Sequence, residues 1–203
     1  MANMCWTDYT FTGNKESLED FRSTLVSTRK EDEDSGRLLP LGLSSILAAF
    51  DFEPDNFVCR GTVEYIEDVC DDTDDESPYL KLSTSTVWVP LPEIWDAILS
   101  ERYPDLHYVM CAEEEGFDLY VNTDKSFKHF DVGYKVVINE DEEIYVGGGD
   151  SAVKELNEIF GWKCKSMKQF ESRLQRKKER MERNGKNFSF KVCKYKDTWK
   201  ASM

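Results

Sequence analysis

The amino-acid sequence predicts an α+β protein in which helices cover one face of an antiparallel sheet and a basic helical segment follows at the C-terminus. Two observations support this prediction. Over residues 6–112, segments with the two-residue alternation of strands are interspersed with segments that have the period of helices. After the glycine run at residues 147–149, the composition changes from acidic and strand-forming to basic and helix-forming.

The first two predicted elements are a strand and a helix. Residues 6–12 have the composition and alternation of a strand. Gly13 and Asn14 end this strand, and the Asn14 side chain is suited to cap a following helix. From Lys15 to Arg29 the apolar residues recur at helical spacing and form one stripe. That stripe consists of Leu18, Phe21, Leu25 and Val26.

A β-hairpin is predicted in the next part of the chain. Residues 30–37 form a charged linker, and residues 44–50 are expected to form a short helix. Residues 61–69 and 79–88 both alternate as strands do, and the acidic residues 71–78 between them are too charged to bury. The two strands are therefore expected to pair around an acidic turn.

A helix and a strand are expected after this hairpin, and they complete the order of elements of a ferredoxin-like fold. Pro92 is suited to the first turn of a helix over residues 93–103, and a strand is expected over 107–112. The order strand, helix, strand, strand, helix, strand over residues 6–112 is the split βαβ arrangement of a ferredoxin-like fold. Extra hairpin strands within residues 117–146 are expected to widen its sheet.

The C-terminal part is predicted to be mainly helical. Ser151 is a candidate cap for a helix that ends at Phe160, and a second helix is expected to start at Ser166. Residues 188–192 alternate and form a candidate last strand. We therefore expect an acidic ferredoxin-like α+β domain at residues 1–150 and a basic helical extension at 151–203.

The charge is distributed unevenly along the chain. The whole sequence has 40 acidic and 26 basic residues, which gives a formal net charge of −14. Residues 1–150 hold 34 acidic and 11 basic residues, whereas residues 151–203 hold six and 15. Binding of nucleic acid needs a basic surface that neutralises phosphates, so the overall charge disfavours a simple nucleic-acid binder. The basic segment by itself remains a candidate.

Several features indicate a cytoplasmic protein. No apolar run approaches the ~18 residues of a membrane-spanning helix, and residues 1–11 lack the pattern of a secretion signal. The six cysteines are irregularly spaced and form no Cys-x-x-Cys pair, which favours reduced thiols. No interaction with a membrane is expected.

Two blocks of the sequence carry a family resemblance. The first is Ala2-Asn3-Met4-Cys5-Trp6 with Thr10-Phe11-Thr12-Gly13. The second comprises Leu82-Ser83-Thr84, Thr86-Val87-Trp88-Val89-Pro90-Leu91-Pro92, Leu99-Ser100, Tyr103-Pro104-Asp105-Leu106 and Glu113-Glu114-Glu115-Gly116-Phe117. These blocks resemble the YubB-like family, which consists of plasmid- and mobile-element-borne proteins with a ferredoxin-like domain.

The resemblance implies a fold and a genetic context but no chemistry. It covers residues 2–28 and 80–120, and it leaves out the basic C-terminal segment. Met4 stands where the family usually has Trp, and Gly61 to Tyr65 takes the place of the family's Asn-Trp-Gly-Thr-Lys-Trp strand. The long proline-rich insertion after the first helix is shortened here. The family supplies no catalytic residues to carry over.

The residue patterns predict no cofactor and no metal site. His107 and His129 lack metal-ligand spacing, and no phosphate-binding loop or nucleophile elbow is present. The acidic residues 71–76 lack the Gly and the distal Glu of a calcium loop, so a solvated turn is favoured over a cation site. Residues 147–149 precede a helix and would suit a phosphate, but a simple turn is favoured. A spatial pairing of Cys with His leaves an unrecognised enzyme as an alternative.

The basic helix is the most distinctive segment. Its candidate nucleic-acid-binding residues are Arg173, Arg176, Lys177, Lys178, Arg180 and Arg183. Aromatic residues are interleaved after it, namely Phe188, Phe190, Tyr195 and Trp199. Such a segment can follow a phosphate backbone with support from stacking, or it can pack against the acidic part of the same chain.

The sequence is therefore consistent with three functions. The first is a non-enzymatic cytoplasmic interaction protein of a mobile genetic element, with an unidentified protein partner. In this case the acidic part of the chain can bind a basic partner, even as a nucleic-acid mimic. The second is a nucleic-acid-associated protein that contacts phosphates through residues 163–200. The third is an unrecognised enzyme.

Overall fold

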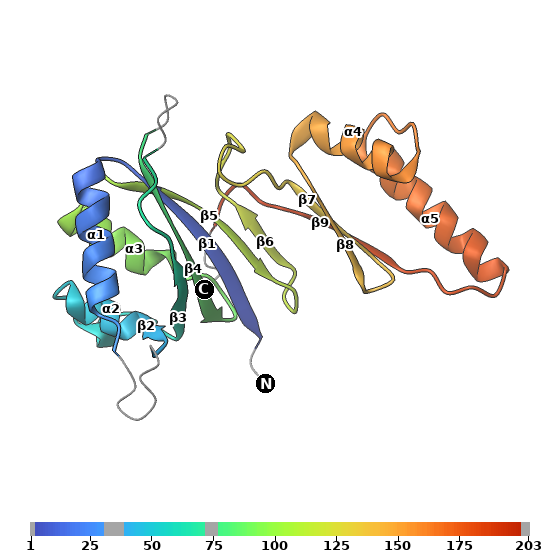
Figure 1. Cartoon of the computed structure of the whole chain (residues 1–203). Helices are drawn as coiled ribbons and strands as arrows, with labels where there is room; N and C mark the ends of the chain where they lie inside the picture. Colours follow the sequence, from blue (N-terminus) through green and yellow to red (C-terminus); the bar gives the residue numbers. More distant parts are fainter. Residues whose placement is uncertain (1–2, 31–38, 72–76, 200–203) are drawn as a thin grey trace. The chain divides into compact units, whose positions relative to one another are not determined.

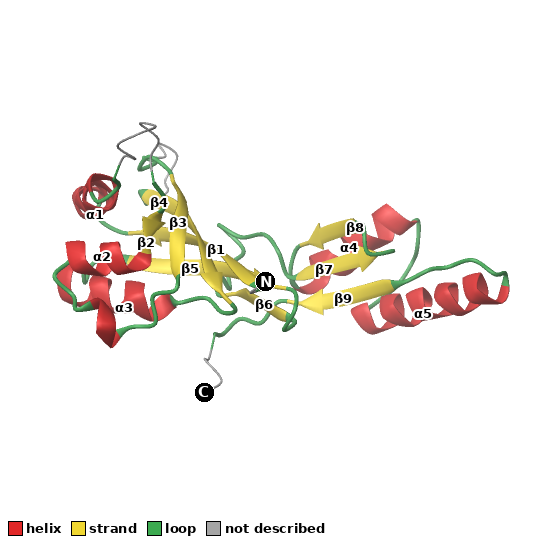
Figure 2. Ribbon diagram, turned by 90° about the horizontal axis from the view of Figure 1, so that it is seen from below, coloured by secondary structure: helices red, strands yellow, loops and turns green. Residues whose placement is uncertain are grey.

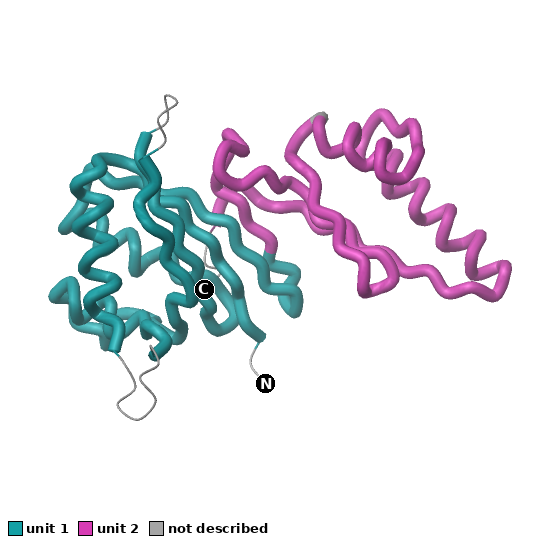
Figure 3. The backbone as a smooth tube through the Cα atoms, in the orientation of Figure 1, with its two compact units in different colours: residues 1–119 teal, residues 120–203 magenta. Residues whose placement is uncertain are grey.

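The computed structural model describes residues 3–30, 39–71 and 77–199 (Figure 1). The chain forms two compact units, residues 1–119 and residues 120–203 (Figure 3). This boundary lies earlier than residue 150, where the change in charge placed it. The reason is that a hairpin from the acidic part of the sequence pairs with the last strand of the basic part.

The first sheet has six strands in the order β2-β3-β4-β1-β5-β6. In chain order these are β1 (Met4–Thr12), β2 (Leu41–Gly42), β3 (Gly61–Ile66), β4 (Tyr79–Val87), β5 (His107–Glu114) and β6 (Leu119–Asn122). Strand β1 pairs antiparallel with both β4 and β5, and β3 pairs antiparallel with both β2 and β4. The predicted hairpin of β3 and β4 is confirmed, as is the α+β class.

Three helices lie on one side of this sheet (Figure 2). They are α1 (Lys15–Ser27), α2 (Leu43–Ala49) and α3 (Pro92–Arg102), and a short 3-10 helix, η1 (Pro54–Asn56), follows α2. The predicted cap of α1 is confirmed, because the Asn14 side chain accepts hydrogen bonds from the backbone N–H groups of Glu16 (2.8 Å) and Ser17 (3.4 Å). Pro92 occupies the first turn of α3, as predicted.

An aromatic core joins the sheet to the helices. Tyr9 and Phe11 project from β1 toward the helices and are fully buried, as are Phe21 of α1 and Trp95 of α3. The Phe11 ring lies 5.1 Å from Phe21 and 5.7 Å from Trp95, measured between centroids. Such tilted and edge-on pairs add stability beyond the area that they bury.

The two acidic stretches lie largely outside the described residues. Asp71 forms an ion pair with Lys15 (2.6 Å) at the start of α1. The remaining acidic residues of the turn, 72–76, and almost all of the charged linker, 31–37, fall in the undescribed part. The cation site that the sequence disfavoured at residues 71–76 therefore lies, apart from Asp71, outside the described residues. None of the described helices is both long and apolar enough to cross a membrane.

The second unit is built on a separate three-stranded sheet with the order β8-β7-β9. Its strands are β7 (Tyr134–Ile138), β8 (Glu142–Val146) and β9 (Phe190–Lys194), and its helices are α4 (Gly149–Phe160) and α5 (Met167–Arg183). Strand β6 joins the first sheet as expected, but the β7–β8 hairpin does not. It pairs with β9 instead, so the basic segment is part of a mixed unit and is not a helical extension.

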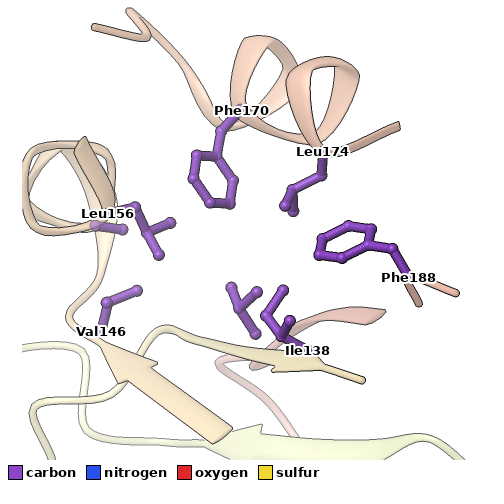
Figure 4. Packing of buried hydrophobic residues seen from close by; sticks show 8 residues of the cluster. Ile138, Val146, Leu156, Phe170, Leu174 and Phe188 are labelled. Carbon is purple, nitrogen blue, oxygen red and sulfur yellow. The ribbon is translucent and has the colours of Figure 1, made fainter. Parts of the chain in front are cut away.

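An apolar cluster joins the helices of the second unit to its sheet (Figure 4). Ile138 of β7 faces Leu156 of α4 and Phe170 and Leu174 of α5, and Val136 of β7 belongs to the same buried cluster. Val146, Ala152 and Phe188 complete the buried set. This cluster defines which side of α5 is buried.

A buried carboxylate organises the loop between β6 and β7. Asp124 is 3% exposed and accepts hydrogen bonds from the N–H groups of Ser126 (3.1 Å), His129 (2.6 Å) and Phe130 (3.2 Å). Burial alone raises the pKa of this carboxyl group, but these hydrogen bonds outweigh burial and lower its pKa below the ordinary value. Asp124 is therefore ionised in the folded protein at neutral pH.

Replacement of Phe170 tests the core of the second unit. We expect Phe170→Ala to destabilise this unit by about 3–5 kcal/mol, because it removes a fully buried ring and leaves a cavity. Hydrogen exchange of the β7 and β9 amides should speed up, while amides of β1 should not change. The control Ile159→Ala alters a residue that is 55% exposed and should change stability by less than about 0.5 kcal/mol. Equal effects of both variants would contradict this assignment.

Replacement of Asp124 tests the charged loop. We expect Asp124→Asn to lower the free energy of unfolding by about 2 kcal/mol at pH 7, because the hydrogen bonds to a charged acceptor are lost. The pKa of Asp124 is lower in the folded protein than its ordinary value of 3.8, so its ionisation stabilises the fold at pH values above 3.8. This stabilisation is lost as the pH falls through the pKa that Asp124 has in the folded protein. Urea denaturation at pH 7, 5 and 3 should therefore show a smaller difference between the two proteins at pH 3 than at pH 7. A gap that is independent of pH would refute the charge effect.

Candidate nucleic-acid interface

Helix α5 is positioned by its cap and by its buried face. The Ser166 hydroxyl accepts a hydrogen bond from the N–H of Gln169 (3.3 Å), so the predicted start of the helix is confirmed. Phe170 and Leu174 are fully buried against the sheet of the second unit. Since these two residues fix the rotation of the helix, they decide which charged residues face outward.

Five of the six predicted basic residues line one groove. The groove has a volume of about 650 Å³. Its lining residues are Phe160, Trp162, Arg173, Arg176, Lys177, Glu179, Arg180 and Arg183, and we call it the arginine groove. Lys178 is not among them, because at position +5 from Arg173 it lies on another side of the helix, where it forms an ion pair with Glu182 (3.9 Å).

The spacing of the basic residues explains why they share one side of α5. Relative to Arg173 they stand at positions +3, +4, +7 and +10, and side chains at such spacings lie on the same face of a helix. At 1.5 Å per residue, the stripe from Arg173 to Arg183 extends over about 15 Å.

Aromatic rings form the other wall of the groove. The Arg173 guanidinium lies over the Trp162 ring, with its Cζ 4.8 Å from the ring centroid. The Lys177 Nζ lies 5.9 Å from the Phe160 centroid and 4.7 Å from that of Phe188. Trp162 itself is held against Phe170, with ring centroids 5.3 Å apart. The rings and cations therefore form one connected surface.

The loop that carries Trp162 is fixed by the end of α4. Gly161 adopts a left-handed conformation (φ 63°) just after this helix, which favours glycine. The Asn157 side chain then donates to the backbone oxygen of Cys164 (2.8 Å) and accepts from the N–H of the same residue (2.7 Å). These contacts hold Trp162 beside α5.

One carboxylate, that of Glu179, lines the groove together with the five cations. Among the described residues, none of Arg173, Arg176, Lys177, Arg180 and Arg183 forms an ion pair. The second unit as a whole holds 18 basic and 13 acidic residues, whereas the first holds eight and 27. The positive charge therefore stays with the unit that contains the groove, even with the earlier boundary.

The glycine run at residues 147–149 leads into helix α4. The predicted cap Ser151 was wrong, because α4 begins two residues earlier at Gly149 and its N-terminal cap is Gly148. The Ser151 hydroxyl donates to the backbone oxygen of Gly148 (2.7 Å), and the N–H of Gly147 donates to the carboxylate of Glu155 (3.2 Å). A carboxylate in this position opposes a phosphate, which supports the interpretation as a turn.

His107 does not lie beside Cys111, although both belong to β5. Cys111 lies opposite Asp8 on β1, whereas His107 lies opposite Thr12 and is about 13 Å away along the strand. Burial, together with the carboxylates of Glu113 and Asp8, raises the pKa of Cys111 to about 12. This shift opposes formation of a nucleophilic thiolate. Among the described residues, no group of His, Cys, Asp and Glu is arranged to hold a metal ion.

Sequence reasoning missed the aromatic wall. Of the interleaved aromatics that it selected, Phe188 is buried in the core with Lys177 over its ring, and Tyr195 packs against Tyr120 at 5.6 Å. Trp162 follows the glycine that ends α4, and only the packing of α4 against α5 shows that it faces the arginine stripe.

Comparison of the chain with protein-family models found no match, and comparisons with curated proteins and with solved structures found none either.

Alkylation of the native protein tests the chemistry of the cysteines. Burial raises the pKa of Cys5 to about 11 and contributes to the raised pKa of Cys111. We expect both to react with iodoacetamide at pH 8 at least about 10-fold more slowly than the half-buried Cys59, because the thiolate is the reactive form. Peptide mapping by mass spectrometry measures the rates, and the urea-denatured protein is the control. Fastest reaction at Cys111 would instead favour an enzyme.

Proposed function

We propose that this protein is a non-enzymatic binding protein that associates with nucleic acid through the arginine groove. The observation that supports this most directly is the stripe of five cations on one side of α5, none of which forms an ion pair among the described residues. Cations held on a rigid helix without neutralising partners form a surface suited to a polyanion.

The chemistry of the groove suits phosphates in particular. Four of the five cations are arginines, and the planar guanidinium binds phosphate oxygens with two parallel hydrogen bonds. In a duplex one strand carries a phosphate about every 3.4 Å along the axis, so a stripe of about 15 Å can contact roughly four of them. Contacts to phosphates carry no sequence information, so we expect the groove to bind without sequence preference.

We further propose that the first unit has the ferredoxin-like split βαβ arrangement. Strands β3, β4, β1 and β5 are adjacent in that order, and every pairing among them is antiparallel. Helix α1 lies between β1 and β3 along the chain, and α3 lies between β4 and β5. With the YubB-like sequence blocks, this arrangement supports a cytoplasmic protein of a mobile genetic element as the context of the binding activity.

Two double variants test the arginine groove. We expect Arg176→Ala with Arg180→Ala to weaken binding to a fluorescein-labelled 20-base-pair duplex by at least about 10-fold, because two phosphate contacts are lost. The slope of log affinity against log salt should also become shallower by about 2. Fluorescence anisotropy at several salt concentrations measures both quantities, and a 20-nucleotide single strand shows which form is preferred.

The matched control removes the same charge from elsewhere on α5. Lys168→Ala with Lys178→Ala lies off the groove and should change the affinity by less than about threefold. No binding of the wild-type protein at low salt would refute the proposed function. An equal loss in both double variants would also refute it, because the effect would then come from net charge alone.

A further inference from the structure

The helix-free face of the first sheet carries an unusual group of exposed side chains. On β1, residues of odd number from Cys5 to Phe11 point into the core, so Met4, Trp6 and Asp8 point the other way. Trp6 is 57% exposed although β1 is an interior strand with neighbours on both sides. An indole left exposed at the centre of a sheet is a feature that folding alone does not require.

The register of the strands places acidic and small residues around Trp6. Ser85 of β4 lies directly opposite Trp6 on one side and Glu113 of β5 on the other. Directly opposed side chains have their Cβ atoms about 5 Å apart. The Trp6 side chain thus has a carboxylate-bearing residue on one flank and the small, buried Ser85 on the other.

The same face continues with the next row of residues. Asp8 lies between Ser83 and Cys111 and accepts a hydrogen bond from the Ser83 hydroxyl. Tyr65 of β3 is paired with Ser83 and is 56% exposed. We call the surface formed by Met4, Trp6, Asp8, Tyr65 and Glu113 the Trp6 face. It combines two exposed aromatic rings with two carboxylates.

Isolated exposed apolar residues are common and need no explanation. The Trp6 face differs because its aromatic rings and carboxylates are placed together by strand register. A cation can lie over an indole ring and at the same time meet a carboxylate, and both interactions strengthen when the surface is covered. Trp and Tyr are also the residues that most often dominate binding at protein interfaces.

We propose that the Trp6 face binds a basic segment of a partner protein, with an arginine or lysine side chain seated over Trp6 and paired with Glu113. The charge of the first unit supports this choice of partner, since it holds 27 acidic and only eight basic residues. The same charge opposes nucleic acid at this face. The inference is independent of the arginine groove, because it rests on residues of the other unit.

Peptide binding to the full-length protein tests this inference. The probe is a fluorescein-labelled hexa-arginine peptide, and a hexa-glutamate peptide serves as the negative probe. We expect Trp6→Ala and Glu113→Gln each to weaken binding of hexa-arginine by at least about fivefold, and Trp6→Phe to retain most of the affinity. Because Trp6 is exposed, its replacement should leave the circular dichroism spectrum and the melting temperature unchanged.

Matched controls separate this site from general attraction to an acidic protein. Phe117→Ala removes an exposed ring, and Glu101→Gln removes an exposed carboxylate at the end of α3. Both should bind hexa-arginine within about twofold of the wild-type protein. Equal losses in Glu101→Gln and Glu113→Gln would overturn the proposal, as would wild-type affinity in Trp6→Ala.

Two further measurements distinguish other occupants. Loss of duplex or single-strand binding in Trp6→Ala would assign the face to nucleic acid and overturn the proposal. Loss of a concentration-dependent dimer in that variant, measured by sedimentation, would assign it to a second copy and would also overturn it. Unchanged duplex binding in Trp6→Ala is expected, so failure at this face and failure at the arginine groove are distinguishable.

Discussion

The pairing of β9 with β7 is the constraint on which the second unit depends. Five residue pairs, from Tyr134 with Lys194 to Ile138 with Phe190, bring the end of the chain back to the hairpin of β7 and β8. The intervening helices α4 and α5 must then close over this sheet, and they bury Leu156, Phe170 and Leu174. Because that burial sets the rotation of α5, it also sets the position of its arginine stripe.

The two units divide the charge of the protein and, as we propose, its binding. The groove of the second unit presents cations on a helix beside Phe160 and Trp162. The Trp6 face of the first unit presents aromatic rings beside carboxylates on a sheet. The two surfaces are chemically opposite, so one suits a polyanion and the other a basic segment. The net charge of −14 for the whole chain hides this division.

The elements of the fold were largely predictable because each depends on neighbours in sequence. The stripe of Leu18, Phe21 and Leu25 and the cap at Asn14 predicted α1, and the alternation of residues 61–69 and 79–88 predicted the β3–β4 hairpin. The domain boundary was not predictable, because composition records where charge changes and not which strands pair. The predicted cap at Ser151 was wrong because Gly148 has the extended backbone conformation of a cap residue, and α4 begins directly after it.

Helix geometry makes part of the site readable from sequence, since the spacing of Arg173, Arg176 and Arg180 places them on one side of α5 and Lys178 on another. The asymmetry of charge is likewise a property of the sequence. The position of Trp162 beside the stripe and that of Glu113 beside Trp6 come only from the tertiary structure. The first depends on helix packing and the second on strand register, and both join residues far apart in the chain.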